Sequence, residues 1–217
     1  MNFPDDEIGK LMDTRERTGF LDNTVILYFS DHGEMLGRHG RWHKQTFFEG
    51  SSRVPLIIRL PESLRILGAD LSDAAMIRPG KRVATPVSLV DVFPTICELA
   101  ARDIPFEVDG MSLLRPPEPE RPVFVEHHDS FGSHRMIRKG RWKLNYYAGF
   151  ESYELFDLHE DPHEKVNLSG MREYAIVEVE LRDALFADGW SGGIKAEHDR
   201  YLTSIGFPET SRIGAPT

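Results

Sequence analysis

The sequence predicts an α/β fold in which part of a helix-flanked sheet is followed by a small antiparallel sheet of four strands and a C-terminal helix. Three observations support this prediction. A nearly continuous apolar run at residues 24–30 is typical of a strand buried on both faces in a parallel sheet. Residues 122–157 contain short strand-like segments separated by turn residues. Apolar residues then recur at helical spacing from Met171 to Leu185.

An amphipathic helix is predicted at residues 4–18, before the first strand. Pro4 suits a first helical turn, acidic residues follow it, and Gly19 is a natural stop. The apolar stripe of this helix consists of Ile8, Leu11 and Met12. A helix, a short loop and a buried strand make up half of a βαβ unit, whose preceding strand is not found in the sequence.

A second strand is predicted at residues 54–60, where Pro55 fits only at the start because proline cannot donate to the ladder. Asp91 is the expected N-cap of a helix that runs to Ala101. Cys97 is then a small buried apolar residue rather than a nucleophile, since nothing near it in sequence would lower its pKa. The expected apolar face of the helix consists of Phe93, Ile96, Cys97, Leu99 and Ala100.

A change of character follows the proline-rich segment at residues 114–121, which is typical of a linker. A small antiparallel sheet is expected after it, with Lys139-Gly140 as a tight turn between two strands. The expected strands lie at residues 122–126, 134–138, 141–147 and 153–157. The predicted parts of the chain are residues 1–115 as part of an α/β domain, 116–187 as the small sheet with its helix, and 188–217 as a tail.

The composition is that of a globular protein. The 217 residues carry a formal net charge of −9, with 40% hydrophobic and 28% charged residues. Nucleic-acid binding usually requires a basic patch, so no nucleic-acid partner is expected for this acidic chain. A single cysteine excludes an intrachain disulfide framework and a multi-cysteine metal site. The sequence contains no run of about 18 apolar residues, so no transmembrane segment is expected. The sequence does not indicate the cellular compartment.

Asp31 and His32 directly follow the first predicted strand. Ligands in open α/β sheets bind just beyond the carboxyl ends of the strands, which makes this pair a candidate for half of a divalent-metal site. A carboxylate with an imidazole suits Mn²⁺, Zn²⁺ or Fe and, with more oxygen ligands, Ca²⁺ or Mg²⁺. Two ligands are too few, so the others must come from elsewhere. The alternative is an aspartate N-cap beside a hydrogen-bonded loop histidine, and the spacing alone does not decide between the two.

Lys44, thirteen residues after Asp31, offers a flexible positive charge that suits an oxyanion. The alternative role for such a lysine is a solvated surface charge. His43 beside it and His127 near the end of a predicted strand are further candidates for binding a substrate, although both could be ordinary surface histidines. Glu49 and Arg53 are expected to form a structural ion pair in the loop before the second strand.

These motifs resemble the second half of a sulfatase, a family of the alkaline phosphatase superfamily. The resemblance runs in the family's order almost to Ala187 and is nearest to choline-sulfatase-like and bacterial arylsulfatase-like members. The segments that carry it are Asp31-His32-Gly33-Glu34-Met35-Leu36-Gly37, Trp42-His43-Lys44, Phe48-Glu49-Gly50-Ser51-Ser52-Arg53-Val54-Pro55-Leu56, and residues 85–95, 136–144 and 154–158.

The resemblance implies metal-dependent hydrolysis of sulfate esters, with residues 1–115 forming the C-terminal part of an alkaline-phosphatase-like catalytic domain. Asp31 and His32 match the family's second pair of metal ligands, for which Ca²⁺ is the first expectation and Mn²⁺ or Mg²⁺ the alternatives. Lys44 matches the lysine that contacts the sulfate and the leaving-group oxygen. Many members have asparagine where this chain has His32, and histidine is shared with phosphonate monoester and some phosphodiester hydrolases. Hydrolysis of such phosphorus esters is therefore the alternative activity.

The chain departs from the family pattern at the nucleophile. That residue is a formylglycine made within a Cys/Ser-x-Pro-x-Arg motif, which does not occur in these 217 residues, and the sequence after Cys97 lacks both the proline and the arginine. The first pair of metal-binding aspartates is not found either. We therefore expect the isolated chain to be inactive and to require the N-terminal half of the domain as its partner. A non-catalytic interaction module is the alternative from another functional class.

Overall fold

The computed structural model describes residues 2–61, 80–115, 118–129 and 132–188, so most of the predicted tail and of the connection after the second strand lie outside the described residues. The chain forms two compact units. The first unit comprises Met1–His32 and Val54–Pro119, and the second comprises Gly33–Arg53 and Glu120–Thr217. The domain boundaries predicted near residues 115 and 187 remain predictions.

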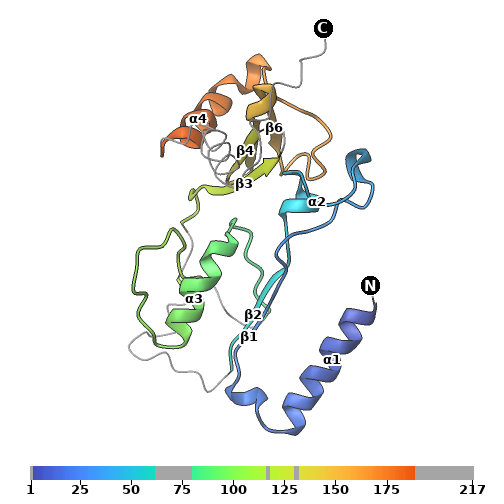
Figure 1. The fold of residues 1–217 in the computed structure, drawn as a ribbon, viewed down its shortest axis with the longest axis vertical. Helices are drawn as coiled ribbons and strands as arrows, with labels where there is room; N and C mark the ends of the chain where they lie inside the picture. Colours follow the sequence, from blue (N-terminus) through green and yellow to red (C-terminus); the bar gives the residue numbers. More distant parts are fainter. Residues whose placement is uncertain (1, 62–79, 116–117, 130–131, 189–217) are drawn as a thin grey trace, which may run out of the picture. The chain divides into compact units, whose positions relative to one another are not determined.

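Helix α1 spans Asn2–Arg17 and begins the first unit (Figure 1). Gly19 adopts a φ of +71° after its last turn, which agrees with its predicted role as a helix stop. Two residues of the apolar stripe are exposed, Ile8 by 37% and Leu11 by 58%, whereas Met12 is half-buried. The helix forms close to its predicted position, and its apolar side is only partly covered.

Strands β1 (Ile26–Phe29) and β2 (Leu56–Arg59) form a two-stranded sheet in the first unit. Their pairing is antiparallel, so the predicted parallel pairing is wrong for the described residues. The prediction that the strand is buried on both faces is also wrong, because Tyr28 and Phe29 are each more than 40% exposed. A continuous apolar run indicates that both faces need cover, but it does not say in which direction the neighbouring strand runs.

Helix α3 (Val92–Leu99) follows a 3₁₀ turn at Leu89–Asp91. Asp91 is its N-cap residue as predicted, but the Asp91 side chain makes no capping hydrogen bond to α3. It instead forms a reciprocal capping box with Ser88, the N-cap of the preceding 3₁₀ turn. Asp91 is fully buried, and its Oδ1 accepts a hydrogen bond of 2.8 Å from the amide of Met111. The predicted apolar face is wrong: Phe93 and Ile96 are 44% and 46% exposed, because the helix buries the side that faces the segment containing Met111.

The second unit contains the predicted antiparallel sheet, with strand order β3-β4-β5-β6. The α/β class and this four-stranded sheet are both confirmed (Figure 1). Lys139 pairs with Trp142 across the predicted tight turn, where Gly140 has a φ of +55°. The strands are β3 (Val123–Asp129), β4 (Gly132–Lys139), β5 (Trp142–Tyr147) and β6 (Ser152–Asp157). Helix α4 spans Ala175–Phe186, and further 3₁₀ turns lie at Leu21–Asn23, Arg38–Gly40, Ala148–Phe150 and Arg172–Tyr174.

One face of this sheet packs against α4 and forms the core of the second unit. Ile137, Leu144 and Leu155 lie opposite one another on neighbouring strands and are fully buried. Leu181 and Leu185 of α4 pack against them, which confirms the predicted packing of this helix on the sheet. No described helix is both long enough and apolar enough to cross a membrane.

The opposite face of the sheet carries both polar side chains and buried apolar ones such as Met136 and Phe156, and it is covered by Gly33–Arg53. The ring centroid of Phe47 lies 5.7 Å from that of Tyr147, and Phe48 packs with Phe156. A short helix, α2 (Glu49–Ser52), belongs to this covering segment. The register places the buried polar side chains of His134, Lys143 and Asn145 on this face, together with half-buried ones that include Arg138, Tyr147 and Glu154. The segment that contains Lys44 therefore packs on a sheet formed by residues nearly a hundred positions later in the chain.

Candidate functional site

Asp31 and His32 lie just beyond the carboxyl end of β1, where the backbone leaves the strand. The Nε2 atom of His32 is 3.4 Å from Oδ2 of Asp31, and the amide of His32 donates a hydrogen bond of 3.0 Å to Oδ1. Ser30 donates its hydroxyl proton to the carbonyl of His32 at 2.8 Å. The Asp31 side chain is 82% and the His32 side chain 38% exposed. The structure thus brings the two predicted metal ligands together at an open strand end.

The chemistry of these two donors fits part of a divalent-metal site. Ligand atoms bound to one ion at about 2.0–2.5 Å can lie about 3 Å apart, close to the 3.4 Å separation of Asp31 and His32. No group of three or more histidine, cysteine, aspartate or glutamate residues among the described residues could hold an ion. The pair therefore fits a metal only if further ligands complete the coordination.

Gly33 follows this pair and makes a close backbone contact in the second unit. Its amide donates a hydrogen bond of 2.7 Å to the carbonyl of Ser51. A Cβ atom at this position would lie only 2.1 Å from the carbonyl oxygen of Gly50, a distance that real Cβ atoms essentially never show. The sequence therefore needs glycine directly after the Asp-His pair.

Gly33→Ala is expected to lower the free energy of unfolding of the second unit by about 1–3 kcal/mol, because the backbone must move to accommodate the methyl group. The matched control is Gly9→Ala in α1, where an added Cβ meets nothing within 4 Å. That change should be stabilising by about 0.5–1 kcal/mol. Urea unfolding of both variants measures the difference. Equal midpoints for Gly33→Ala and the unchanged protein would contradict the close packing.

Lys44 and His43 lie in the covering segment of the second unit. The backbone of Lys44 is fixed on two sides, since its carbonyl accepts hydrogen bonds from the hydroxyl of Ser51 and from the amide of Thr46, the latter at 2.8 Å. Both side chains are exposed. The amide of His43 donates to Oε1 of Glu34 at 2.5 Å, and His43 has a left-handed φ of +68°. The lysine therefore projects from an ordered backbone.

His127 lies within β3, opposite His134. Its Nε2 atom is 3.9 Å from Oδ2 of Asp129, and its side chain is 29% exposed. His128 faces the other side of the sheet, where its ring contacts the hydroxyl of Ser133 at 3.1 Å. Asp31 and His32 thus belong to the first unit, whereas Lys44, His43 and His127 belong to the second. Their roles in substrate binding remain predictions.

The structure also reveals a buried ionic cluster that the sequence did not indicate. Glu49 does form the predicted pair with Arg53, at 3.9 Å, but its closer partner is Lys143 at 3.1 Å. Tyr147 is a half-buried polar residue of the same sheet face. Burial and the neighbouring Glu154 raise the pKa of Tyr147, so its hydroxyl stays protonated and donates to Glu154 at 3.0 Å. The alternation of polar residues along β5 was the available signal, since it marks a non-apolar sheet face.

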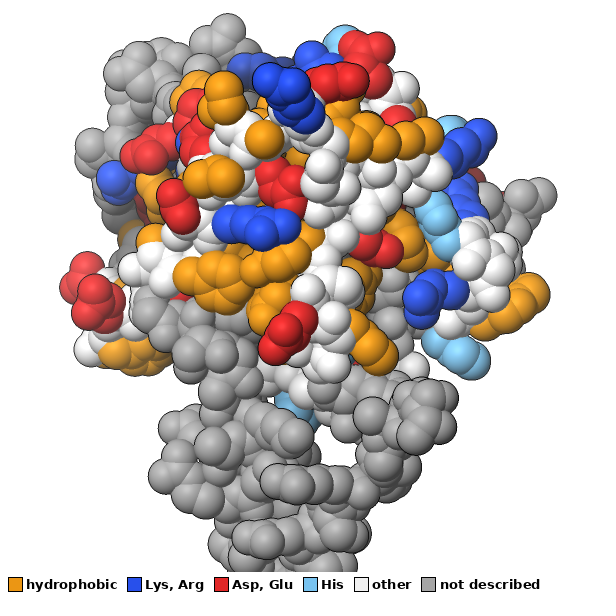
Figure 2. Space-filling view, turned by 90° about the horizontal axis from the view of Figure 1, so that it is seen from above, with side chains coloured by type: hydrophobic (Ala, Val, Ile, Leu, Met, Phe, Trp, Pro, Cys, Tyr) orange, Lys and Arg blue, Asp and Glu red, His pale blue; other side chains and the backbone are white. Residues whose placement is uncertain are grey.

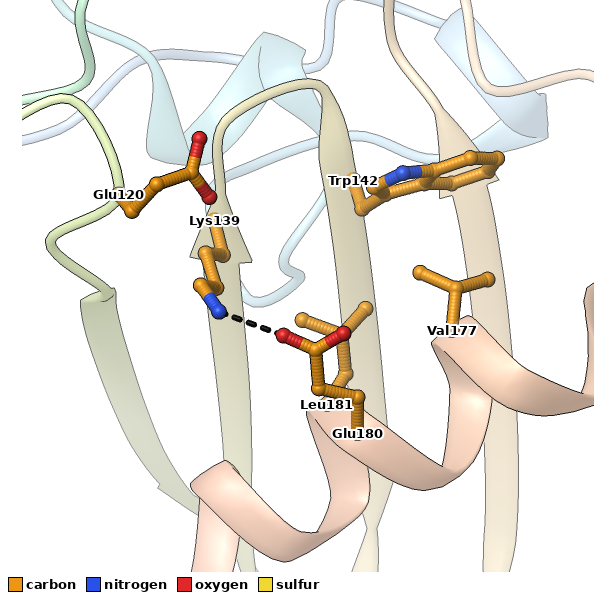
Figure 3. A pocket seen from close by; sticks show the side chains of 6 residues that line it. All are labelled: Glu120, Lys139, Trp142, Val177, Glu180 and Leu181. Carbon is orange, nitrogen blue, oxygen red and sulfur yellow. Dashed lines mark hydrogen bonds and ion pairs between the residues drawn. The ribbon is translucent and has the colours of Figure 1, made fainter.

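A small pocket of about 190 Å³ lies on the α4 side of the sheet (Figure 3). Lys139 crosses it to reach Oε1 of Glu180 at 2.5 Å, and this hydrogen bond raises the pKa of Lys139. Ligand pockets usually enclose about 300–1,000 Å³, and no predicted site residue lines this one. Its lining consists of Glu120, Lys139, Trp142, Val177, Glu180 and Leu181.

Comparisons with known proteins match most of this chain. The family model described as Sulfatase matches residues 1–102. A choline-sulfatase of Rhizobium meliloti (strain 1021) is 40% identical over 177 residues, which are 78% of this chain and 31% of that protein. The chain spans about a third of the length of the curated relatives it matches.

Two solved structures show the same fold. The phosphonate monoester hydrolase of Agrobacterium radiobacter superposes with a TM-score of 0.69 at 29% identity, covering 84% of this chain and 38% of that one. A protein solved in complex with its substrate D-glucosamine-2-N,6-O-disulfate gives a TM-score of 0.67 at 26% identity, covering 96% of this chain and 40% of the other.

Proposed function

Because this chain belongs to the sulfatase family of the alkaline phosphatase superfamily, we propose that it contributes metal ligands and a cation to the hydrolysis of sulfate esters. The observation that carries the proposal is that Asp31, His32 and Lys44 all lie inside the segment that matches the family model, residues 1–102. The open Asp31–His32 pair at the end of β1 supports it, because its donors suit a divalent ion.

In the proposed mechanism Asp31 and His32 hold the divalent ion, and Lys44 acts on the substrate. When bound, the ion would supply positive charge that polarises the sulfuryl group. Lys44 donates hydrogen bonds to a sulfate oxygen and to the leaving-group oxygen, where negative charge develops as the ester bond breaks. The exposed ammonium group on an ordered backbone supports this role. We propose Ca²⁺ as the ion, with Mn²⁺ or Mg²⁺ as alternatives.

The nucleophile and the remaining metal ligands are proposed to come from outside these 217 residues. No Cys/Ser-x-Pro-x-Arg motif occurs in the sequence. Tyr28, Phe29 and Ile57 of the two-stranded sheet are exposed by 41%, 43% and 59%, which supports a further layer of structure against β1 and β2. The isolated chain is therefore expected to show no turnover.

A phosphonate monoester hydrolase is the second candidate. His32 and the structural similarity to the enzyme of Agrobacterium radiobacter favour it. The test compares kcat/KM for an aryl sulfate and a matched aryl phosphonate ester, using the protein expressed from its complete reading frame. The sulfate ester is expected to be preferred by at least about tenfold, which corresponds to about 1.4 kcal/mol in transition-state stabilisation.

A preference for the phosphonate ester would replace the first proposal by the second. Failure to hydrolyse either ester, in the presence of Ca²⁺, Mn²⁺ or Mg²⁺, would contradict both. It would leave the non-catalytic interaction module as the better account.

A further inference from the structure

A buried ionic cluster lies between the sheet of the second unit and the segment that carries Lys44. Its centre is Lys143, whose side chain is fully buried. The Nζ atom of Lys143 is 2.7 Å from Oε1 of Glu164 and 3.1 Å from Oε1 of Glu49. Arg138 approaches Oε2 of Glu49 at 3.3 Å. With Arg53, which lies 3.9 Å from Oε2 of Glu49, three cations surround the two carboxylates, and the Glu164 side chain is only 2% exposed.

The cluster is connected to Lys44 through α2. The second carboxylate oxygen of Glu164, Oε2, accepts a hydrogen bond of 2.6 Å from the amide of Glu49, the first residue of α2. Two residues later in the same helix, Ser51 donates its hydroxyl proton to the carbonyl of Lys44. The buried charges and the backbone of the exposed lysine are therefore joined by one short helix.

The backbone at Glu164 supports a specific role for its side chain. Glu164 has a left-handed φ of +55°, which residues other than glycine rarely adopt. The preceding Asp161 holds the turn, because its Oδ2 accepts hydrogen bonds from the amides of Lys165 and Val166 at 2.5 and 2.9 Å. A strained backbone conformation persists only where the surrounding contacts enforce it, and such conformations are concentrated at functional sites.

We propose that Lys143 and Glu164 are positioning residues, which hold α2 and thereby the backbone of Lys44 in the orientation that substrate contact requires. This inference rests on the proposed function of Lys44. Exposed ion pairs contribute little to stability, and charges of both signs are mixed over the face in Figure 2. A buried ion pair also adds little net stability, because apolar residues of similar volume in its place would often stabilise the fold equally or better. The cluster is therefore better explained by the orientation it enforces than by stability.

The first test is hydrogen–deuterium exchange of the full chain with Glu164→Gln. The exchange rate of amides 44–52 is expected to rise at least about tenfold, because the amide of Glu49 and the ammonium of Lys143 lose their shared carboxylate. The matched control is Glu178→Gln. Glu178 is equally buried at 4% exposure, but it accepts from the hydroxyl of Ser169 and the amide of Gly170, beside α4.

Glu178→Gln should increase exchange near residues 169–182 and leave amides 44–52 unchanged. An unchanged rate at 44–52 in Glu164→Gln, or an equal increase in both variants, would overturn the inference. Exchange does not depend on turnover, so this result stands even if no sulfate ester is hydrolysed.

The second test is a double-mutant cycle on kcat/KM for an aryl sulfate, in the protein expressed from its complete reading frame. Glu164→Gln alone is expected to lower kcat/KM at least about tenfold, whereas in a Lys44→Ala background it should have less than about a twofold effect. Glu178→Gln should leave kcat/KM within about twofold. Equal losses from Glu164→Gln in both backgrounds would show a role independent of Lys44 and would overturn the inference. Absence of turnover in the unchanged protein would instead contradict the proposed function.

Discussion

Asp31→Ala is expected to lower kcat/KM for an aryl sulfate by at least about 10³-fold in the protein expressed from its complete reading frame. A metal ion acting on the transferred group is worth several kcal/mol of transition-state stabilisation, and about 4 kcal/mol corresponds to about 10³-fold in rate. Asp31 supplies the charged donor of the pair, and its side chain is 82% exposed. The fold should therefore not suffer, and the free energy of unfolding should change by less than about 0.5 kcal/mol.

The metal dependence identifies the reason for the loss. Asp31→Asn keeps an oxygen that can accept from the amide of His32 but removes the charge. We expect its activity to recover in part as the concentration of Ca²⁺ is raised, whereas Asp31→Ala should not respond. Asp13→Ala, an exposed carboxylate of α1, is the control and should retain full activity. Full activity in Asp31→Ala would show that this residue is not a metal ligand.

Lys44→Ala is expected to lower kcat for the sulfate ester by about 10²–10³-fold, the usual cost of removing one preorganised donor from a developing negative charge. The side chain is exposed, so stability should be unaffected. Lys44→Arg keeps the charge but not its compact shape, and an intermediate rate is expected. The matched control is Lys165→Ala, an exposed lysine of the same unit, which should behave as the unchanged protein.

The division of the loss between kcat and KM shows what Lys44 does. An effect on kcat indicates an interaction made mainly in the transition state, whereas a higher KM at constant kcat indicates uniform binding of the sulfate group. Only the first agrees with donation to the leaving-group oxygen. A rate unchanged in Lys44→Ala would leave the lysine as a solvated surface charge.

Local patterns in the sequence predicted most of the described elements. The strands of the small sheet and helix α4 were found because alternation and helical spacing are properties of neighbouring residues. Strand β2 was also found, but the antiparallel direction in which it pairs with β1 was not, since the apolar run carries no information on strand direction. The N-cap of α3 was correctly assigned to Asp91, but its side chain bonds to Ser88 across the preceding 3₁₀ turn, which the sequence alone did not indicate.

The candidate site shows the same limit. Asp31, His32 and Lys44 can be recognised in the sequence because these charged and imidazole side chains follow a predicted strand within a short stretch of residues. Glu164 is 115 residues from its partner Glu49, and Lys143 is 94 residues from it, so no local pattern joins them. The partly polar face of the small sheet and the segment that covers it became visible only in three dimensions.

The most direct test of the central claim is to read the coding frame upstream of the Met1 codon. If these residues complete a sulfatase whose nucleophile lies outside them, the frame continues in phase and encodes a Cys/Ser-x-Pro-x-Arg motif. Stop codons directly before Met1 would contradict the account, because no nucleophile would then be encoded in the same chain as Asp31, His32 and Lys44.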